Sequence, residues 1–113
     1  MVLITRYDVK EHILELNSKQ KAALRTLGQR LKPTVVIGKA GLSDSLITNV
    51  KAVIARVELL KVRMPAGSAE QRQQMADDLA KACDAAVAGV VGRNALLYRS
   101  SEEVAPKNRI VLP

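Results

Sequence analysis

Aromatic side chains are almost missing from this chain of 113 residues, which has no tryptophan, no phenylalanine and only two tyrosines, Tyr7 and Tyr98. Proteins that hold single strands by stacking bases need several exposed aromatic rings. The composition therefore excludes a stacking platform of this kind. Tyr98 leaves two interpretations open, a single stacked base or a half-buried strand tyrosine.

Cysteine and histidine are equally scarce, with one of each, Cys83 and His12. A single cysteine excludes an internal disulfide and a zinc site built from cysteines. We expect Cys83 to be a buried thiol on the inner face of a helix, and His12 to be a solvated side chain in an N-terminal extension. No acid pair, activated nucleophile or metal-ligand cluster can be assembled, so the sequence predicts a non-enzyme with no cofactor and no small-molecule substrate.

Long apolar runs are also missing, since none approaches the roughly 18 residues of a membrane span. The first residues carry Asp8, Glu11 and Glu15, unlike a signal or transit peptide. We therefore expect a cytoplasmic protein without a membrane partner. The 48% hydrophobic content is typical of one folded domain with its own core.

Acidic residues are outnumbered, with 11 against 18 lysines and arginines, which gives a net charge of +7. The basic residues are spread along the chain rather than gathered in a tail. This distribution predicts a basic surface on a folded domain, and nucleic-acid phosphate is the anion that such a surface most commonly meets.

The hydrophobic pattern predicts one α/β domain over residues 16–113, preceded by an extension of residues 1–15 with a short helix near 9–16. Alternating elements of this kind predict a compact two-layer sandwich with a four-stranded mixed sheet. Residues 110–112 are expected to return to this sheet. The expected helices are 18–30, 43–56 and 68–85, and the expected strands are 34–37, 58–64, 87–91 and 95–99.

The first predicted helix has an apolar stripe and a basic side. Its stripe is expected to contain Ala23, Leu24, Leu27 and Leu31, and its basic side Lys21, Arg25 and Lys32. Capping-box spacings mark two helix starts, one from Asn17 to Gln20 and one from Ser68 to Gln71. The β-branched segment 34–37 is expected to be a fully covered strand.

A two-glycine loop, Gly38-Lys39-Ala40-Gly41, follows that strand and precedes the second helix. Glycines let a ligand approach the backbone closely, and the N-terminus of the following helix offers unpaired N–H groups and a positive dipole end. The loop is either a phosphate clamp or a tight turn whose glycines supply only backbone freedom. No Walker A or dinucleotide fingerprint is present.

Several motifs taken in order resemble the CRM domain, named for chloroplast RNA splicing and ribosome maturation, and in particular its stand-alone bacterial form, the YhbY-like proteins. The resemblance covers about residues 16–112 and depends on the order of the motifs more than on any single one. The motifs are Leu16-Asn17-Ser18-Lys19-Gln20-Lys21, Leu31-Lys32-Pro33, Ile37-Gly38-Lys39-Ala40-Gly41-Leu42-Ser43, Leu59-Leu60-Lys61-Val62 and Leu96-Leu97-Tyr98-Arg99.

The resemblance implies a fold similar to the C-terminal domain of translation initiation factor three. It also implies RNA binding by the glycine loop and neighbouring basic residues, on ribosomal RNA in precursors of the large ribosomal subunit. The third loop position is often polar in the family and is Ala40 here, which removes a side-chain contact but not the backbone clamp. The candidate RNA-binding residues are Gly38, Lys39, Ala40, Gly41, Lys19, Lys21, Arg25, Lys32, Lys61 and Arg63.

Two other classes of function remain open at the level of sequence. Small basic α/β domains also coat duplex DNA as architectural proteins, and a basic face can bind an acidic protein partner.

Overall fold

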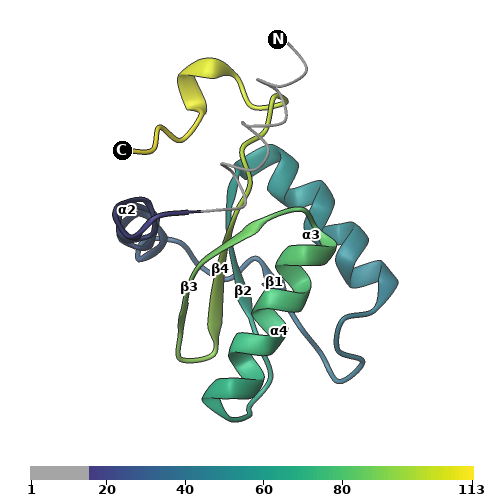
Figure 1. The fold of residues 1–113 in the computed structure, drawn as a ribbon. Coiled ribbons are helices and arrows are strands. Elements are labelled where there is room, and N and C mark those ends of the chain that lie inside the picture. The colour runs from purple at the N-terminus through teal and green to yellow at the C-terminus, as the bar shows by residue number, and fades with distance from the viewer. Residues whose placement is uncertain (1–15) are drawn as a thin grey trace, which may run out of the picture.

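The computed structural model describes residues 16–113; the predicted extension of residues 1–15, with its short helix and His12, lies outside them. Helices and strands alternate in the expected order (Figure 1). The elements are α2 (Ser18–Gly28), β1 (Val35–Val36), α3 (Asp44–Val57), β2 (Leu59–Arg63), α4 (Ala69–Ala82), β3 (Ala86–Val91), β4 (Asn94–Tyr98) and the short 3-10 helix η1 (Pro106–Asn108).

The four strands form one mixed sheet in the order β1-β2-β4-β3. β1 runs parallel to β2, as the crossover through α3 requires, whereas β2, β4 and β3 are antiparallel neighbours. The predicted α/β fold with a four-stranded mixed sheet is confirmed. β1 and β3 form the two edges of this sheet, and their positions organise the surfaces described below.

Each face of the sheet has a hydrophobic core, so the described domain has three layers and the predicted two-layer arrangement is wrong, because α2 covers the face opposite α3 and α4. On one face, α3 and α4 pack against inward residues such as Leu60, Val62 and Leu97. On the other face, α2 packs with the C-terminal segment over Leu59, Leu96 and Tyr98. Figure 1 shows α2 on one side of the strands and α3 and α4 on the other. Leu60 and Leu59 of β2 belong to different cores because successive side chains of a strand point to opposite faces of the sheet.

α2 begins where the sequence predicts but ends earlier. The amide N–H of Gln20 donates to Asn17 Oδ1 at 2.8 Å, and the N–H of Asn17 donates to Gln20 Oε1 at 3.1 Å, which completes the capping box. The helix ends at Gly28, and its predicted apolar stripe is wrong beyond Leu24, since Leu27 and Leu31 are 48% and 37% exposed. Leu31 lies after the last helical turn, where helical spacing no longer sets its direction.

The prediction of a fully covered first strand is wrong at Val36, which is 63% exposed, while Val35 and Ile37 are buried. β1 is an edge strand, and α2 packs on the other three strands. No helix within residues 16–113 covers the face of β1 that carries Val36, and only the opposite face, which carries Val35, is packed in the core.

The expected return of residues 110–112 to the sheet is also wrong, because this segment forms no strand. Instead Ile110 N–H donates to Glu58 Oε1 at 2.8 Å, and Ile110 and Leu112 pack on the core beneath α2. The Glu58 side chain therefore holds residues 110–112 in place, where the sequence predicted the hydrogen bonds of a strand. Cys83 is buried at the end of α4, as predicted.

Candidate nucleic-acid interface

The glycine loop is a closed turn between β1 and α3. The N–H of Gly41 donates to the carbonyl of Gly38 at 3.0 Å, and the N–H of Ser43 donates to the carbonyl of Gly41 at 3.0 Å. Within residues 16–113, the backbone N–H groups of Lys39 and Ala40 find no backbone acceptor. Unpaired donors at the tip of a turn are suited to an anion, and the Lys39 side chain adds a positive charge beside them.

The two glycines of this loop have different reasons to be there. Gly41 has a φ of +68°, a left-handed conformation that strains other residues. Gly38 lies in no such conformation, and a Cβ at its position would meet nothing within 4 Å. Neither the fold nor the packing of the described chain therefore requires glycine at 38. Its small size matters only to something that approaches from outside.

The start of α3 is already well satisfied. Ser43 Oγ accepts the N–H of Leu46 at 3.2 Å, and Asp44 places a carboxylate in the first turn. Both features offset the positive end of the helix dipole. The anion donors at this site are therefore mainly the loop N–H groups and Lys39, and the α3 dipole contributes less than its sequence position predicts.

Three exposed cations lie along this end of the sheet, and we call Lys39, Arg63 and Arg93 the sheet-end row. Ile37 N–H donates to the carbonyl of Arg63 at 2.8 Å, which places the loop beside the end of β2. Met64 N–H donates to the carbonyl of Arg93 at 2.6 Å, and Arg93 Nε donates back to the carbonyl of Met64 at 3.1 Å. These backbone contacts make the three residues neighbours in turn.

Arg93 is not among the candidate residues taken from the sequence; it lies between the expected strands 87–91 and 95–99. A turn connects β3 to β4 through Gly92, whose φ is +57°. Only the pairing of β4 with β2 brings that turn next to Met64. The signal available in the sequence was the exposed arginine at a tight turn, which is no guide to position without the topology.

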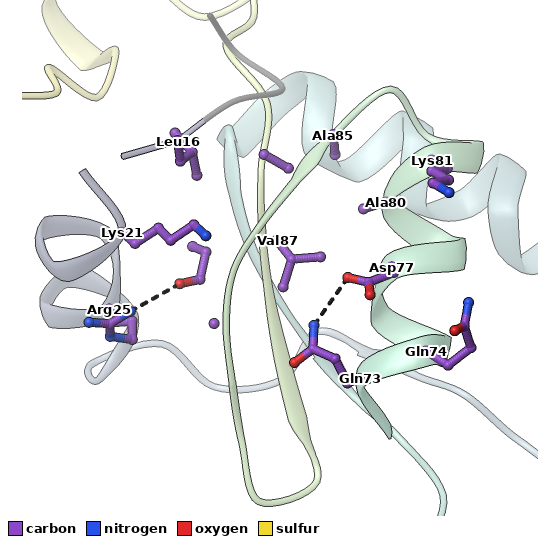
Figure 2. Close-up of a pocket in the computed structure, with 13 residues that line it drawn as sticks. Leu16, Lys21, Arg25, Gln73, Gln74, Asp77, Ala80, Lys81, Ala85 and Val87 are labelled. Atoms are coloured by element: carbon purple, nitrogen blue, oxygen red, sulfur yellow. Dashed lines mark hydrogen bonds between the residues drawn. The ribbon is translucent and has the colours of Figure 1, made fainter. Parts of the chain in front are cut away.

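Lys21 and Arg25 lie at the opposite edge of the sheet, along β3. They line a groove of about 770 Å³ between α2 and α4, shown in Figure 2. Arg25 Nη1 donates to the carbonyl of Ala88 at 3.4 Å. The Arg25 side chain also lies against Gly89, so closely that a Cβ on Gly89 would be only 2.9 Å from Arg25 Cδ. Arg25 therefore also packs across β3, in addition to its predicted role as a phosphate contact.

The remaining predicted cations are dispersed. Lys19 is exposed near the start of α2, and Lys32 is exposed in the connection from α2 to β1. Lys61 is half-buried beneath α2, where it borders a small cavity of about 120 Å³ with Gly28 and Gln29. The structure thus brings the loop and Arg63 together and leaves the other predicted contacts in separate places.

Tyr98 is buried in the core beneath α2, with only 4% of its surface exposed, so it is not available to stack on a base. Burial raises the pKa of Tyr98 above its ordinary value, and the Glu58 carboxylate raises the pKa further. Burial likewise raises the pKa of the Cys83 thiol. Neither group has the exposure that a chemical role would need.

No three histidine, cysteine, aspartate or glutamate side chains among residues 16–113 gather closely enough to hold a metal ion. No helix of the described residues combines the length and the apolar character needed to cross a bilayer.

The model of the CRS1/YhbY (CRM) domain family matches residues 16–99, which is most of the chain. The chain belongs to the CRM domain family. Its match includes the glycine loop, Arg63 and Arg93, and ends just after β4.

Three relatives match most of this chain. An RNA-binding protein of Haemophilus influenzae is 31% identical over 88 residues, covering 78% of this chain and 89% of the relative. Proteins named for RNA binding from Bacillus subtilis and Methanocaldococcus jannaschii are 30% and 36% identical, covering 78% and 82% of this chain and 92% and 70% of theirs.

A solved structure has the same fold. The solution structure of a Staphylococcus aureus protein, described as a candidate RNA-binding protein, aligns with a TM-score of 0.77 at 29% identity. The alignment covers 88% of this chain and all of that one. This CRM domain therefore shares both its sequence family and its architecture with stand-alone bacterial proteins of similar size.

Proposed function

We propose that this CRM domain is a non-catalytic RNA-binding protein, and that its target is ribosomal RNA in cytoplasmic precursors of the large ribosomal subunit. The names of the relatives support RNA as the ligand. The resemblance to stand-alone YhbY-like proteins supports the ribosomal target. The observation that carries the proposal is Gly38, which neither the fold nor the packing requires to be glycine.

The glycine loop holds one backbone phosphate. The N–H groups of Lys39 and Ala40 point at the phosphate oxygens, and the Lys39 ammonium neutralises its charge. A side chain at position 38 would occupy the space through which the phosphate approaches. Ala40 adds no polar contact, so the clamp acts through the backbone.

Neighbouring phosphates bind along the sheet-end row, where Arg63 and Arg93 continue the positive surface from the loop. Arginine suits this role because its planar guanidinium makes paired hydrogen bonds to phosphate. With Tyr98 buried, the described chain offers no exposed aromatic ring for stacking. Recognition therefore depends on the shape of the RNA backbone more than on its bases.

The loop is tested by Gly38→Val, measured by fluorescence anisotropy with a labelled single-stranded RNA. We expect the dissociation constant to rise about tenfold, because the side chain blocks phosphate from the loop N–H groups, while thermal unfolding stays near that of the wild type. Lys39→Ala should weaken binding, and Lys107→Ala, an equal loss of charge in η1 at the other end of the molecule, should not (Figure 1). Unchanged affinity in Gly38→Val would refute the loop assignment.

The ribosomal target is tested by crosslinking the protein to RNA in cells and sequencing the bound fragments. We expect fragments of large-subunit ribosomal RNA, together with sedimentation of the protein with large-subunit precursors that nuclease treatment abolishes. Preference for duplex DNA over structured RNA in a direct competition would favour an architectural DNA-binding protein. If the protein still sediments with large-subunit precursors after nuclease treatment, the result would favour a protein-interaction module.

A further inference from the structure

β3 is an edge strand whose outer backbone groups have no partner strand. Thr34 and Ile37 donate to the carbonyls of Lys61 and Arg63, so these two residues of β2 face β1. The backbone N–H and carbonyl groups of successive residues in an antiparallel strand point to opposite sides. Those of Ala95 and Leu97 therefore point toward β2, and those of Leu96 and Tyr98 point toward β3.

The same alternation, carried across the pairing of β3 with β4, turns the N–H and carbonyl of Val90 outward. The carbonyl of Ala88 faces outward too, since it accepts the Arg25 guanidinium. Within residues 16–113 no backbone hydrogen bond joins β3 to a segment outside the sheet. The outer edge of β3 is thus open to another extended backbone at Val90, and the carbonyl of Ala88 keeps a second lone pair beside its bond to Arg25.

Residues 86–89 of this edge lie at the bottom of the groove of about 770 Å³, with α2 as one wall and α4 as the other, and Val90 follows directly after them in the strand. Figure 2 shows Lys21 extending from α2 toward β3, and Gln73 and Asp77 extending from α4. The volume is within the roughly 300–1,000 Å³ of typical ligand sites. Edge strands are usually protected by charged residues, proline or a bulge. The sequence of β3, Ala-Val-Ala-Gly-Val-Val, contains no charge and no proline, and its one irregularity is a register shift between Val87 and Gly89, which leaves Val90 in regular pairing.

The charged groups lining the groove are three cations, Lys21, Arg25 and Lys81, and one acid, Asp77. Asp77 already accepts a hydrogen bond from Gln73 Nε2 at 3.1 Å. Arg25 makes one long hydrogen bond to Ala88, and its other guanidinium N–H groups bond to nothing within the described residues. The groove therefore favours a ligand that carries carboxylates.

We propose that the β3 edge docks an extended acidic segment of a partner protein, which adds to the sheet as a fifth strand. Its backbone pairs with Val90 and Ala88, and its carboxylates meet Lys21, Arg25 and Lys81. A second copy of this chain is disfavoured, since pairing two β3 strands would bring like charges together. A nucleic-acid strand is disfavoured because its sugar-phosphate backbone does not repeat the alternating N–H and carbonyl groups that pair with a strand edge.

The test uses a fluorescein-labelled hexapeptide that alternates glutamate with valine, with anisotropy as the readout of binding to the full chain. The matched control is the same hexapeptide with alternate backbone amides methylated, which keeps the charge but removes the donors that pair with β3. We expect the methylated peptide to bind at least about tenfold more weakly. Equal binding of the two peptides, or no binding of either, would overturn the proposal.

Two variants locate the site. Val90→Pro removes the outward N–H at a position where an edge strand tolerates proline, and should weaken peptide binding about tenfold. Lys81→Glu reverses one exposed charge on the α4 wall and should weaken binding about threefold, whereas Lys107→Glu should not. If Lys107→Glu lost as much affinity for the peptide as Lys81→Glu, the loss would come from the net charge of the protein, and the proposed docking site would be wrong. Lys81→Glu keeps the test valid if Val90→Pro unfolds.

RNA binding is measured in parallel with a labelled single-stranded RNA. Neither Val90 nor Lys81 belongs to the proposed phosphate contacts, so both variants should bind RNA as the wild type does. If RNA displaces the peptide from the wild type, and this displacement is lost in Lys81→Glu, the groove is a nucleic-acid site instead. Peptide binding without RNA binding would refute the proposed function and leave the docking site standing.

Discussion

Glu58 is a charged residue that is almost completely buried, with 1% of its surface exposed. Its two carboxylate oxygens accept backbone N–H groups, Oε2 from Ser101 at 2.7 Å and Oε1 from Ile110 at 2.8 Å. Its φ of +64° is a strained conformation for a residue with a side chain. The carboxylate thereby fastens the C-terminal segment to the junction of α3 and β2.

Replacing this carboxylate tests how much the fastening contributes. In Glu58→Gln, one acceptor oxygen becomes an NH₂ donor that faces a backbone N–H, so a buried donor loses its partner. We expect the free energy of unfolding to fall by about 2 kcal/mol, measured by urea denaturation. The control Glu102→Gln changes an exposed carboxylate and should stay within about 0.5 kcal/mol. Equal effects of the two variants would contradict this role.

Tyr98 should make the protein sensitive to alkali. Burial and the Glu58 carboxylate raise the pKa of Tyr98 above its ordinary 10.0, so the folded state resists losing the phenolic proton. Between the two pKa values the unfolded chain binds fewer protons than the folded one. The stabilisation is therefore complete below about pH 10 and is lost as pH rises through the folded pKa.

The measurement is the pH dependence of stability in the wild type and in Tyr98→Phe. The variant should lose the part of the alkaline decline that comes from this phenol, and its absorbance titration should retain only Tyr7. An identical alkaline decline in both proteins would show that Tyr98 ionises in the folded state as it does in the unfolded chain.

Among the elements, α2 depends on a close approach to the sheet. A Cβ on Gly28 would lie 2.7 Å from Leu96 Cδ2, closer than side chains tolerate, whereas the same atom on Gly38 would meet nothing. We expect Gly28→Ala to lower the free energy of unfolding by about 1 kcal/mol and Gly38→Ala to leave it nearly unchanged. Thermal denaturation compares the two. A stabilised Gly28→Ala would mean that Leu96 rotates away at little cost and helix propensity dominates.

Periodicity predicted those elements that pack along one continuous face. The apolar spacing of α3 puts Val50 and Ile54 on one helix face, and both lie in the core. The two-residue period of β2 puts Leu60 and Leu59 on opposite faces, and they lie in different cores. It failed for Leu27 and Val36, because both lie where the covering layer ends. Spacing tells which side chains share a face, but not how far the neighbouring element extends.

At the scale of the whole molecule, the basic residues separate into surfaces at opposite edges of the sheet. Three strand spacings, roughly 14 Å, separate β1, beside the glycine loop, from β3, beside Lys21 and Arg25. A single phosphate clamp cannot include both. The glycine loop is the reason we assign the sheet-end row to RNA, and the open backbone edge of β3 is the reason we assign the groove to a protein segment.

Salt dependence tests the size of the RNA surface. Three phosphate contacts by the sheet-end row predict that the logarithm of the affinity for single-stranded RNA falls with that of salt at a slope of about −2. Arg93→Ala should reduce the magnitude of this slope by about 0.7, while Lys107→Ala should leave it unchanged. A flat salt dependence would exclude an electrostatic RNA surface, and an unaltered slope in Arg93→Ala would remove Arg93 from it.

The sequence by itself determined the family, the order of the elements, the capping boxes of Asn17 and Ser68, and the glycine loop, because each depends on residues close together in the chain. Only the tertiary structure decided which distant residues meet. It placed Arg93 beside the end of β2, put Arg25 across β3, buried Tyr98 and left the edge of β3 open. These outcomes depend on the strand order and on where the helices end, and local sequence patterns encode neither.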